Sequence, residues 1–181
     1  MIEHIIGYHC GPALAGIKPA NLVAFQKGQI SNIFSEIKRL NKELNGGDIF
    51  LKILCECDKR VLVMVYRSKI LNQSLQDPER RDFLYRLGYP ADIFCQLKHL
   101  KEKLENKEFP HEIGVFLGYP MQDIYGFLSK KEEECLLTGE WKVYHNQESA
   151  KKMFCRYQAC RKGILKRLME GKTLAQLFCA A

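Results

Sequence analysis

The fold class follows from the stretch Ile49-Phe-Leu-Lys-Ile-Leu-Cys-Glu-Cys57 and from the run Val61-Leu-Val-Met-Val-Tyr-Arg67 that comes after it. The polar turn at Asp58-Lys59 separates the two. Both runs are rich in Ile, Val, Leu and Phe, which favour strands, and the turn between them predicts a β-hairpin. Helical patterns surround this hairpin. We therefore predict an α+β (mixed α/β) fold with a small, largely antiparallel sheet of three to four strands. Helices are expected to pack mainly on one face of the sheet, and the C-terminal helix is expected to be long.

Helices are predicted where apolar residues recur at helical spacing and a capping residue precedes them. The pair Gly11-Pro12 is predicted to break the first helix, and residues 10–21 are predicted to form turns or short capped helices. Ser31 and Asn146 are expected to cap two of the longer helices. Helices are predicted over residues 2–9, 31–44, 78–88, 91–106, 121–130 and 147–170, and further short strands over 112–117 and 141–144.

One tetrapeptide occurs twice, as Leu87-Gly88-Tyr89-Pro90 and again thirty residues later as Leu117-Gly118-Tyr119-Pro120. Glycine permits the positive φ that ends one element, and proline presets φ at the start of the next helix. We interpret the repeat as a turn that the fold uses twice, and a duplicated functional half is the alternative.

The 181 residues are enough for one domain with a full core. No linker or low-complexity tract divides the chain, so a single domain over residues 1–181 is predicted. The apolar positions of the predicted elements indicate a core that includes Phe34, Ile37, Leu51, Ile53, Val63, Val65, Phe116, Phe127, Met153 and Tyr157.

The composition predicts a cytoplasmic protein that does not bind membranes. No apolar run approaches the ~20 residues that span a bilayer. The N-terminal Met1-Ile2-Glu3-His4 lacks the basic region and the long apolar stretch of a secretory signal. Most of the eight cysteines lie within apolar periodic segments, where a free cysteine behaves as a small hydrophobe. We expect reduced thiols and a reducing compartment.

The net charge of +7 resides in one segment. Residues 142–172 hold nine Lys or Arg against Glu148 and Glu170, so this segment alone sums to +7. Most of these bases avoid the apolar side of the predicted C-terminal helix, and such a face would meet phosphates or an acidic protein. A solvated surface without a partner is the alternative. The predicted basic patch comprises Lys151, Lys152, Arg156, Lys162, Lys166 and Arg167.

The first candidate for chemistry is the segment from Tyr8 to Asn21. A cysteine beside a Gly-Pro turn, with Lys18 eight residues on, would have a lowered pKa and would attack as a thiolate. Lys18-Pro19, ahead of a short helix expected to begin at Ala20, would offer a cation and free N–H groups to a small anionic ligand. The alternative is that Cys10 packs inside the protein while the glycine and proline shape a corner.

The second candidate is His111, which precedes the predicted strand and the turn at Tyr119-Pro120. Histidine titrates near neutral pH and acts as a base or a ligand, so a Cys10–His111 pair is the sharpest enzyme hypothesis. A structural histidine is the alternative. His9, Lys18, Asn21, Tyr119 and Trp141 are the predicted ligand-binding residues.

Trp141 and Tyr144 flank Lys142 and would line a pocket for a planar ligand, with core packing as the alternative. A metal site is not predicted. Cys55 and Cys57 point to the same side of a strand, but no second closely spaced Cys or His pair completes a zinc pattern.

A set of residues spread over nearly the whole chain matches a known family. These residues are Tyr8-His9-Cys10-Gly11-Pro12, Leu14-Ala15-Gly16-Ile17-Lys18-Pro19-Ala20-Asn21-Leu22, His111-Glu112-Ile113-Gly114, Phe116-Leu117-Gly118-Tyr119-Pro120, Asp123, Gly126-Phe127, Gly139, Trp141-Lys142-Val143-Tyr144, Phe154, Tyr157 and Cys160. In them the chain resembles a family of uncharacterised proteins from clostridial bacteria, domain of unknown function 3793. The resemblance implies a cytoplasmic protein of an anaerobic bacterium and supplies no activity. Glu140 stands where we expect an aromatic residue in this family.

Two classes of function follow. The first is a small-molecule-binding or redox-linked protein with a pocket formed by Cys10–Asn21 and His111–Pro120, in which catalysis through Cys10 is left open. The second is an interaction module that binds an acidic protein or nucleic acid through the basic C-terminal helix. The sequence identifies no cofactor.

Overall fold

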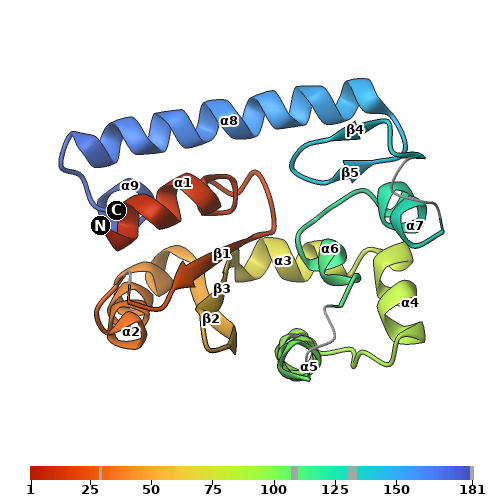
Figure 1. Cartoon of the computed structure of the whole chain (residues 1–181), viewed down its shortest axis with the longest axis horizontal. Coiled ribbons are helices and arrows are strands. Elements are labelled where there is room, and N and C mark those ends of the chain that lie inside the picture. The colour runs from red at the N-terminus through yellow and green to blue at the C-terminus, as the bar shows by residue number, and fades with distance from the viewer. Residues whose placement is uncertain (29, 107–109, 130–133, 180–181) are drawn as a thin grey trace.

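The fold is described from a computed structural model that covers residues 1–28, 30–106, 110–129 and 134–179 (Figure 1). Its centre is a three-stranded antiparallel sheet in the order β1-β3-β2. The strands are β1 (Ala20–Gln26), β2 (Ile49–Glu56) and β3 (Arg60–Arg67). The predicted hairpin is therefore confirmed as β2–β3, and the α+β class is confirmed with it.

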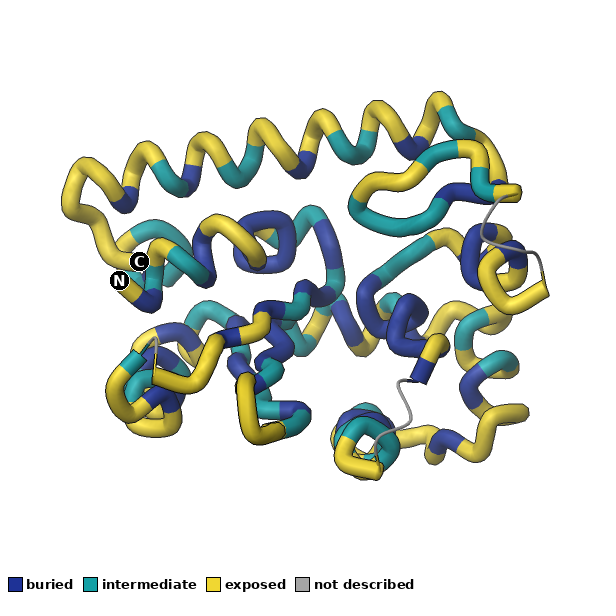
Figure 2. Tube along the Cα trace, in the orientation of Figure 1, coloured by how far each residue is buried: buried dark blue, intermediate teal, exposed yellow. Residues whose placement is uncertain are grey.

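Alternation along β3 explains why helices cover both faces of the sheet. Val61, Val63 and Val65 point to one hydrophobic cluster, which α1 (Ile2–Leu14) and α2 (Ile33–Leu44) share. The intervening Met64 points to a second cluster, which α3 (Ser68–Leu75), α5 (Ile93–Glu105) and α6 (Ile113–Phe116) share. Dark buried segments accordingly lie on both sides of the strands in Figure 2, and the face under α1 and α2 is the more heavily covered.

The other elements complete the outer layers. The long C-terminal helix α8 (Gln147–Met169) runs beside α1 along one edge of the molecule (Figure 1). Near the N-terminal end of α8, β4 (Leu137–Thr138) and β5 (Lys142–Val143) form a small hairpin that packs on α7 (Met121–Ser129). The remaining bounds are η1 Asn45–Gly47, α4 Pro78–Arg86 and α9 Leu174–Phe178.

The first helix does not break at Gly11-Pro12 as predicted but continues to Leu14. Gly11 lets α1 approach α8, since a Cβ there would lie 3.0 Å from Ile164 Cδ1. The N–H of Ala13, which follows the proline, donates to Asn21 Oδ1 at 3.1 Å. A tertiary hydrogen bond thus stabilises the backbone where the proline interrupts the helix. The short helix expected at Ala20 is also wrong, because β1 begins there.

The predicted strand 112–117 is instead the one-turn helix α6. All four of its residues, Ile113-Gly114-Val115-Phe116, are buried, so none alternates toward solvent. A short apolar run of this kind is equally consistent with a strand and with a buried helix. Here the Leu117 N–H donates to the Ile113 carbonyl at 3.1 Å, which closes a helical turn. The other predicted helices are confirmed, although Asn32 caps α2 where Ser31 was expected.

Most of the predicted core is buried, but two members are wrong. Phe34 is 47% exposed on the outer side of α2, and Phe127 is 36% exposed beside a pocket. Ile53 and Met153 are half-buried. No helix in the described part of the chain is both long and apolar enough to cross a bilayer.

The repeated tetrapeptide forms the same turn at both positions. Gly88 and Gly118 have φ values of 82° and 73°, and each follows a helix. Tyr89 N–H donates to the Leu84 carbonyl at 3.0 Å, and Tyr119 N–H donates to the Gly114 carbonyl at 2.9 Å. The backbone therefore agrees with a reused helix-ending turn.

Candidate functional site

The second copy of this turn brings the two predicted site segments together. A Cβ on Gly118 would lie 2.5 Å from Pro19 Cδ, so only glycine allows the chains to approach this closely. Beside this contact, Lys18 Nζ lies 4.9 Å from the centroid of the Tyr119 ring. Residues 10–21 and 111–120 thus contact each other at Pro19–Gly118 and Lys18–Tyr119.

An aromatic pocket of about 180 Å³ lies next to this contact. Its walls come from the segment around α6, from α7 and from the β4–β5 hairpin, and most of its lining is apolar or aromatic. The lining residues are His111, Ile113, Gly114, Tyr119, Asp123, Ile124, Phe127, Trp141 and Lys142. Three of the predicted site residues, His111, Tyr119 and Trp141, are therefore neighbours in one hollow.

The rings of the aromatic pocket are held in fixed positions. Tyr119 and Trp141 stack with their centroids 5.2 Å apart, and His111 lies at the same distance from Phe127. The Tyr119 hydroxyl donates to the Glu140 carbonyl at 3.0 Å. The pocket therefore has preformed flat walls, which reduces the entropy lost when a ligand binds.

Asp123 orients the wall that contains Trp141. Its carboxylate is only 3% exposed and accepts three N–H groups. Trp141 Nε1 donates to Oδ2 at 2.7 Å, and the backbone N–H groups of Tyr144 and His145 donate to Oδ1 at 2.8 Å each. This side chain ties α7 to the chain that follows β5. We did not predict it as a site residue, and its only sequence signal is an acid on a largely apolar helix.

Lys18 stands behind the Tyr119 wall and does not line the pocket. Its ammonium is 2% exposed and lies over the rings of Tyr119 and Tyr157. Burial lowers the pKa of Lys18 to about 8, and the nearby Glu140 carboxylate opposes this shift. Glu140 itself binds Arg161, whose Nη2 lies 2.7 Å from Oε2, and this hydrogen-bonded pairing lowers the pKa of Glu140.

Cys10 is not placed for nucleophilic chemistry. Its side chain is fully buried in the cluster between α1 and the sheet, and burial raises the pKa of the thiol despite Lys18 and Arg161. His111 is exposed and lines the aromatic pocket, to which Cys10 does not contribute. The proposed Cys10–His111 pair therefore has no structural support, and the alternative of a packed cysteine fits the geometry.

The other two predicted ligand residues lie elsewhere. Asn21 is buried, and its side-chain oxygen is used by the α1 backbone. His9 lines a separate hollow of about 720 Å³ together with Arg161 and Phe154, and burial followed by the charge of Arg161 lowers its pKa. Neither residue reaches the aromatic pocket.

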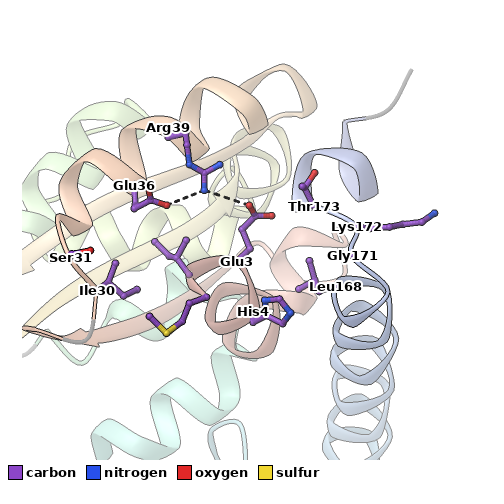
Figure 3. Close-up of a pocket in the computed structure, with 12 residues that line it drawn as sticks. Glu3, His4, Ile30, Ser31, Glu36, Arg39, Leu168, Gly171, Lys172 and Thr173 are labelled. Atoms are coloured by element: carbon purple, nitrogen blue, oxygen red, sulfur yellow. Dashed lines mark hydrogen bonds and ion pairs between the residues drawn. The ribbon is translucent and has the colours of Figure 1, made fainter.

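A further hollow of about 400 Å³ lies where α1, α2 and the segment before α9 meet (Figure 3). Three of its charged groups bind one another, since Arg39 lies 3.5 Å from Glu3 and 3.1 Å from Glu36. Glu3 also accepts the Leu174 N–H at 2.7 Å. This network joins helices from opposite ends of the sequence, and we assign it a structural role.

All eight cysteines lie in the described part of the chain and are free thiols. The exposed Cys57, in the β2–β3 turn, has a lowered pKa because the backbone N–H groups of Lys59 and Arg60 stabilise its thiolate. Among the described residues, no group of three or more His, Cys, Asp or Glu side chains is arranged to hold a metal ion.

A family model described as protein of unknown function (DUF3793) matches residues 6–178. The matched range includes every residue of the aromatic pocket and all of α8. No curated protein and no solved structure matches the chain.

Proposed function

The chain belongs to this family, domain of unknown function 3793, and we propose that it is a small-molecule-binding protein whose aromatic pocket takes a planar ligand. The observation that carries the proposal is the ring arrangement around an apolar hollow. Tyr119, Trp141, Phe127 and His111 all line it, and hydrogen bonds fix the first two. The segment Cys10–Asn21 supports the pocket from behind through Lys18 and Pro19.

The size of the pocket limits the ligand. Its volume of about 180 Å³ is below the ~300–1,000 Å³ typical of sites for drug-sized molecules. A ligand of one or two rings fits such a hollow. An aromatic contact between a ligand ring and one of the aromatic side chains of the lining contributes about 0.5–1.5 kcal/mol beyond the buried area.

The lining favours a neutral ligand over a cation, because the carboxylate of Asp123 already accepts three N–H groups. Displacing those donors would leave buried N–H groups unpaired, at a cost of about 1–3 kcal/mol each. A cationic ligand therefore gains little from Asp123.

We further propose that the protein works in the cytoplasm of an anaerobic bacterium. The free thiols support a reducing compartment. The anaerobic setting rests on the resemblance to the clostridial family.

Intrinsic fluorescence tests the proposal, because Trp141 is the only tryptophan in the chain and lines the pocket. Titration with benzoate, nicotinamide and adenine should give a saturable change in Trp141 emission with at least one of them. Phe127→Ala removes a half-exposed wall and should weaken that binding at least tenfold. Phe94→Ala removes a ring that is 67% exposed on α5, outside the pocket, and should bind as the wild type does. Equal binding by both variants, or no saturable change with any probe, would refute the proposal.

A further inference from the structure

The side of α8 that faces away from α1 is an exposed basic surface, visible as yellow along the outer edge of the helix in Figure 2. From residue 149 to residue 169 the helix contains no acidic residue. We call this surface the basic face. Its exposed basic members are Lys151, Lys152, Arg156, Lys162, Lys166 and Arg167.

Four of these charges have no ion-pair partner among the residues that the structure describes. Glu148 lies 3.2 Å from Lys151 and Glu170 lies 3.3 Å from Arg167, so the acids compensate only the two ends of the face. The uncompensated members are Lys152, Arg156, Lys162 and Lys166. At 1.5 Å rise per residue, they extend over roughly 21 Å of helix.

Helical spacing spreads these bases over the whole outer side of the helix. Residues eleven positions apart share one line along a helix, so Lys151 and Lys162 form one row, while Arg156 and Arg167 form another. Lys152 and Lys166 lie between the two rows, among the small exposed residues Cys155, Ala159 and Gly163. A Cβ added to Gly163 would meet no atom within 4 Å, so the middle of the face is open to a partner there.

The composition of the basic face favours a duplex over other acidic partners. Protein interfaces depend on buried aromatic and large apolar side chains, and single-stranded nucleic acids stack on aromatic rings. The exposed part of α8 between its two end glutamates carries neither, apart from Met169 at its last position. Phosphate contacts require only basic side chains, so duplex DNA is the partner that needs nothing more than this surface offers.

We propose that the basic face of α8 docks on duplex DNA over its major groove, with the bases of both rows, and Lys152 and Lys166 between them, directed to the phosphates that border the groove. The groove is about 12 Å wide and a helix with side chains is about 10–12 Å across. Double-stranded RNA has a major groove too narrow for this placement. Because the lysines and arginines contact phosphates, and Cys155, Ala159 and Gly163 offer no bidentate contact to a base edge, binding is independent of sequence.

Fluorescence anisotropy with a labelled 20-base-pair DNA of mixed sequence tests this inference. With four phosphates neutralised, log K should fall against log[NaCl] with a slope of about −3.6. Between 50 and 200 mM NaCl the affinity should therefore drop roughly 150-fold. No binding at 50 mM, or a salt-independent affinity, would overturn the proposal.

Matched charge reversals locate the surface. Replacing Lys152, Arg156, Lys162 and Lys166 by Glu should abolish binding at 50 mM NaCl. Replacing the exposed Lys38, Lys42, Lys59 and Lys69 by Glu changes the net charge equally but leaves α8 intact, and should retain most of the affinity. Equal losses in the two variants would show that net charge alone acts, and tighter binding of single-stranded DNA, duplex RNA or poly-glutamate would contradict the choice of duplex DNA.

Discussion

Replacement of Asp123 should damage the fold and the aromatic pocket together. Asp123→Ala leaves three N–H groups without an acceptor: Trp141 Nε1 and the backbone N–H groups of Tyr144 and His145. An unsatisfied buried donor costs about 1–3 kcal/mol. Two of the three bonds are only partly buried, so water partly replaces them, and we expect a loss of about 3–5 kcal/mol in the free energy of unfolding.

Thermal unfolding followed by circular dichroism measures this effect. A loss of that size should lower Tm by on the order of 10 °C in a chain of this length. Asp123→Asn keeps the shape but turns one acceptor into a donor, so it should cost about 1–3 kcal/mol. The exposed Asp92 accepts one N–H at the start of α5, and Asp92→Ala should cost only about 1 kcal/mol. If Asp123→Ala unfolds at the temperature of Asp92→Ala, then Asp123 does not hold the pocket wall.

Three further predictions follow from single groups. Iodoacetamide should modify Cys57 first and Cys10 last, because Cys57 is exposed with a lowered thiol pKa whereas Cys10 is buried with a raised one; peptide mass spectrometry would contradict this if Cys10 reacted early. Gly118→Ala should cost about 1–3 kcal/mol more than Gly88→Ala, since both glycines have positive φ but only a Cβ at Gly118 would collide with Pro19; equal urea midpoints would refute the close approach. Burial lowers the pKa of Lys18 to about 8 from 10.5, so the unfolded chain binds more protons between these pH values and this group makes stability rise with pH across that window. The free energy of unfolding of the wild type should thus rise by up to about 3 kcal/mol relative to that of Lys18→Met between pH 8 and 10.5. If the two proteins show the same pH dependence of stability, the pKa of Lys18 is not lowered by burial.

Local sequence signals predicted the elements that depend on local physics. The β2–β3 hairpin follows from two β-branched runs around a polar turn, and the start of α8 follows from Asn146, whose side chain accepts the Ser149 N–H at 3.1 Å. The repeated Gly-Tyr-Pro turn could also be predicted from the sequence, because the positive φ that ends each helix depends on a single glycine.

The errors arose where tertiary contacts override local preference. The helix α1 continues through Pro12 because Asn21, from a strand, accepts the N–H of Ala13. The segment 112–117 is an apolar run that fits a strand or a buried helix equally well, and in the fold it forms the helix α6. No periodicity within either segment carries that information.

The same reasoning explains the partial success at the candidate site. His111, Tyr119 and Trp141 were recognised by residue type, and the structure places them around one hollow. Cys10 has an intrinsically reactive side chain, but its reactivity depends on burial, which the neighbouring sequence does not reveal. Asp123 was missed because its role appears only when α7 meets the chain after β5.

The most direct test of the aromatic pocket is the indole N–H resonance of Trp141 in a ¹⁵N-labelled sample titrated with a planar ligand. The single tryptophan gives one such signal, and its proton is donated to Asp123. Binding in the aromatic pocket should shift this resonance and produce nuclear Overhauser contacts from the ligand protons to Trp141 and Tyr119. Ligand-induced shifts confined to residues outside the pocket, with the Trp141 indole signal unmoved, would contradict the account.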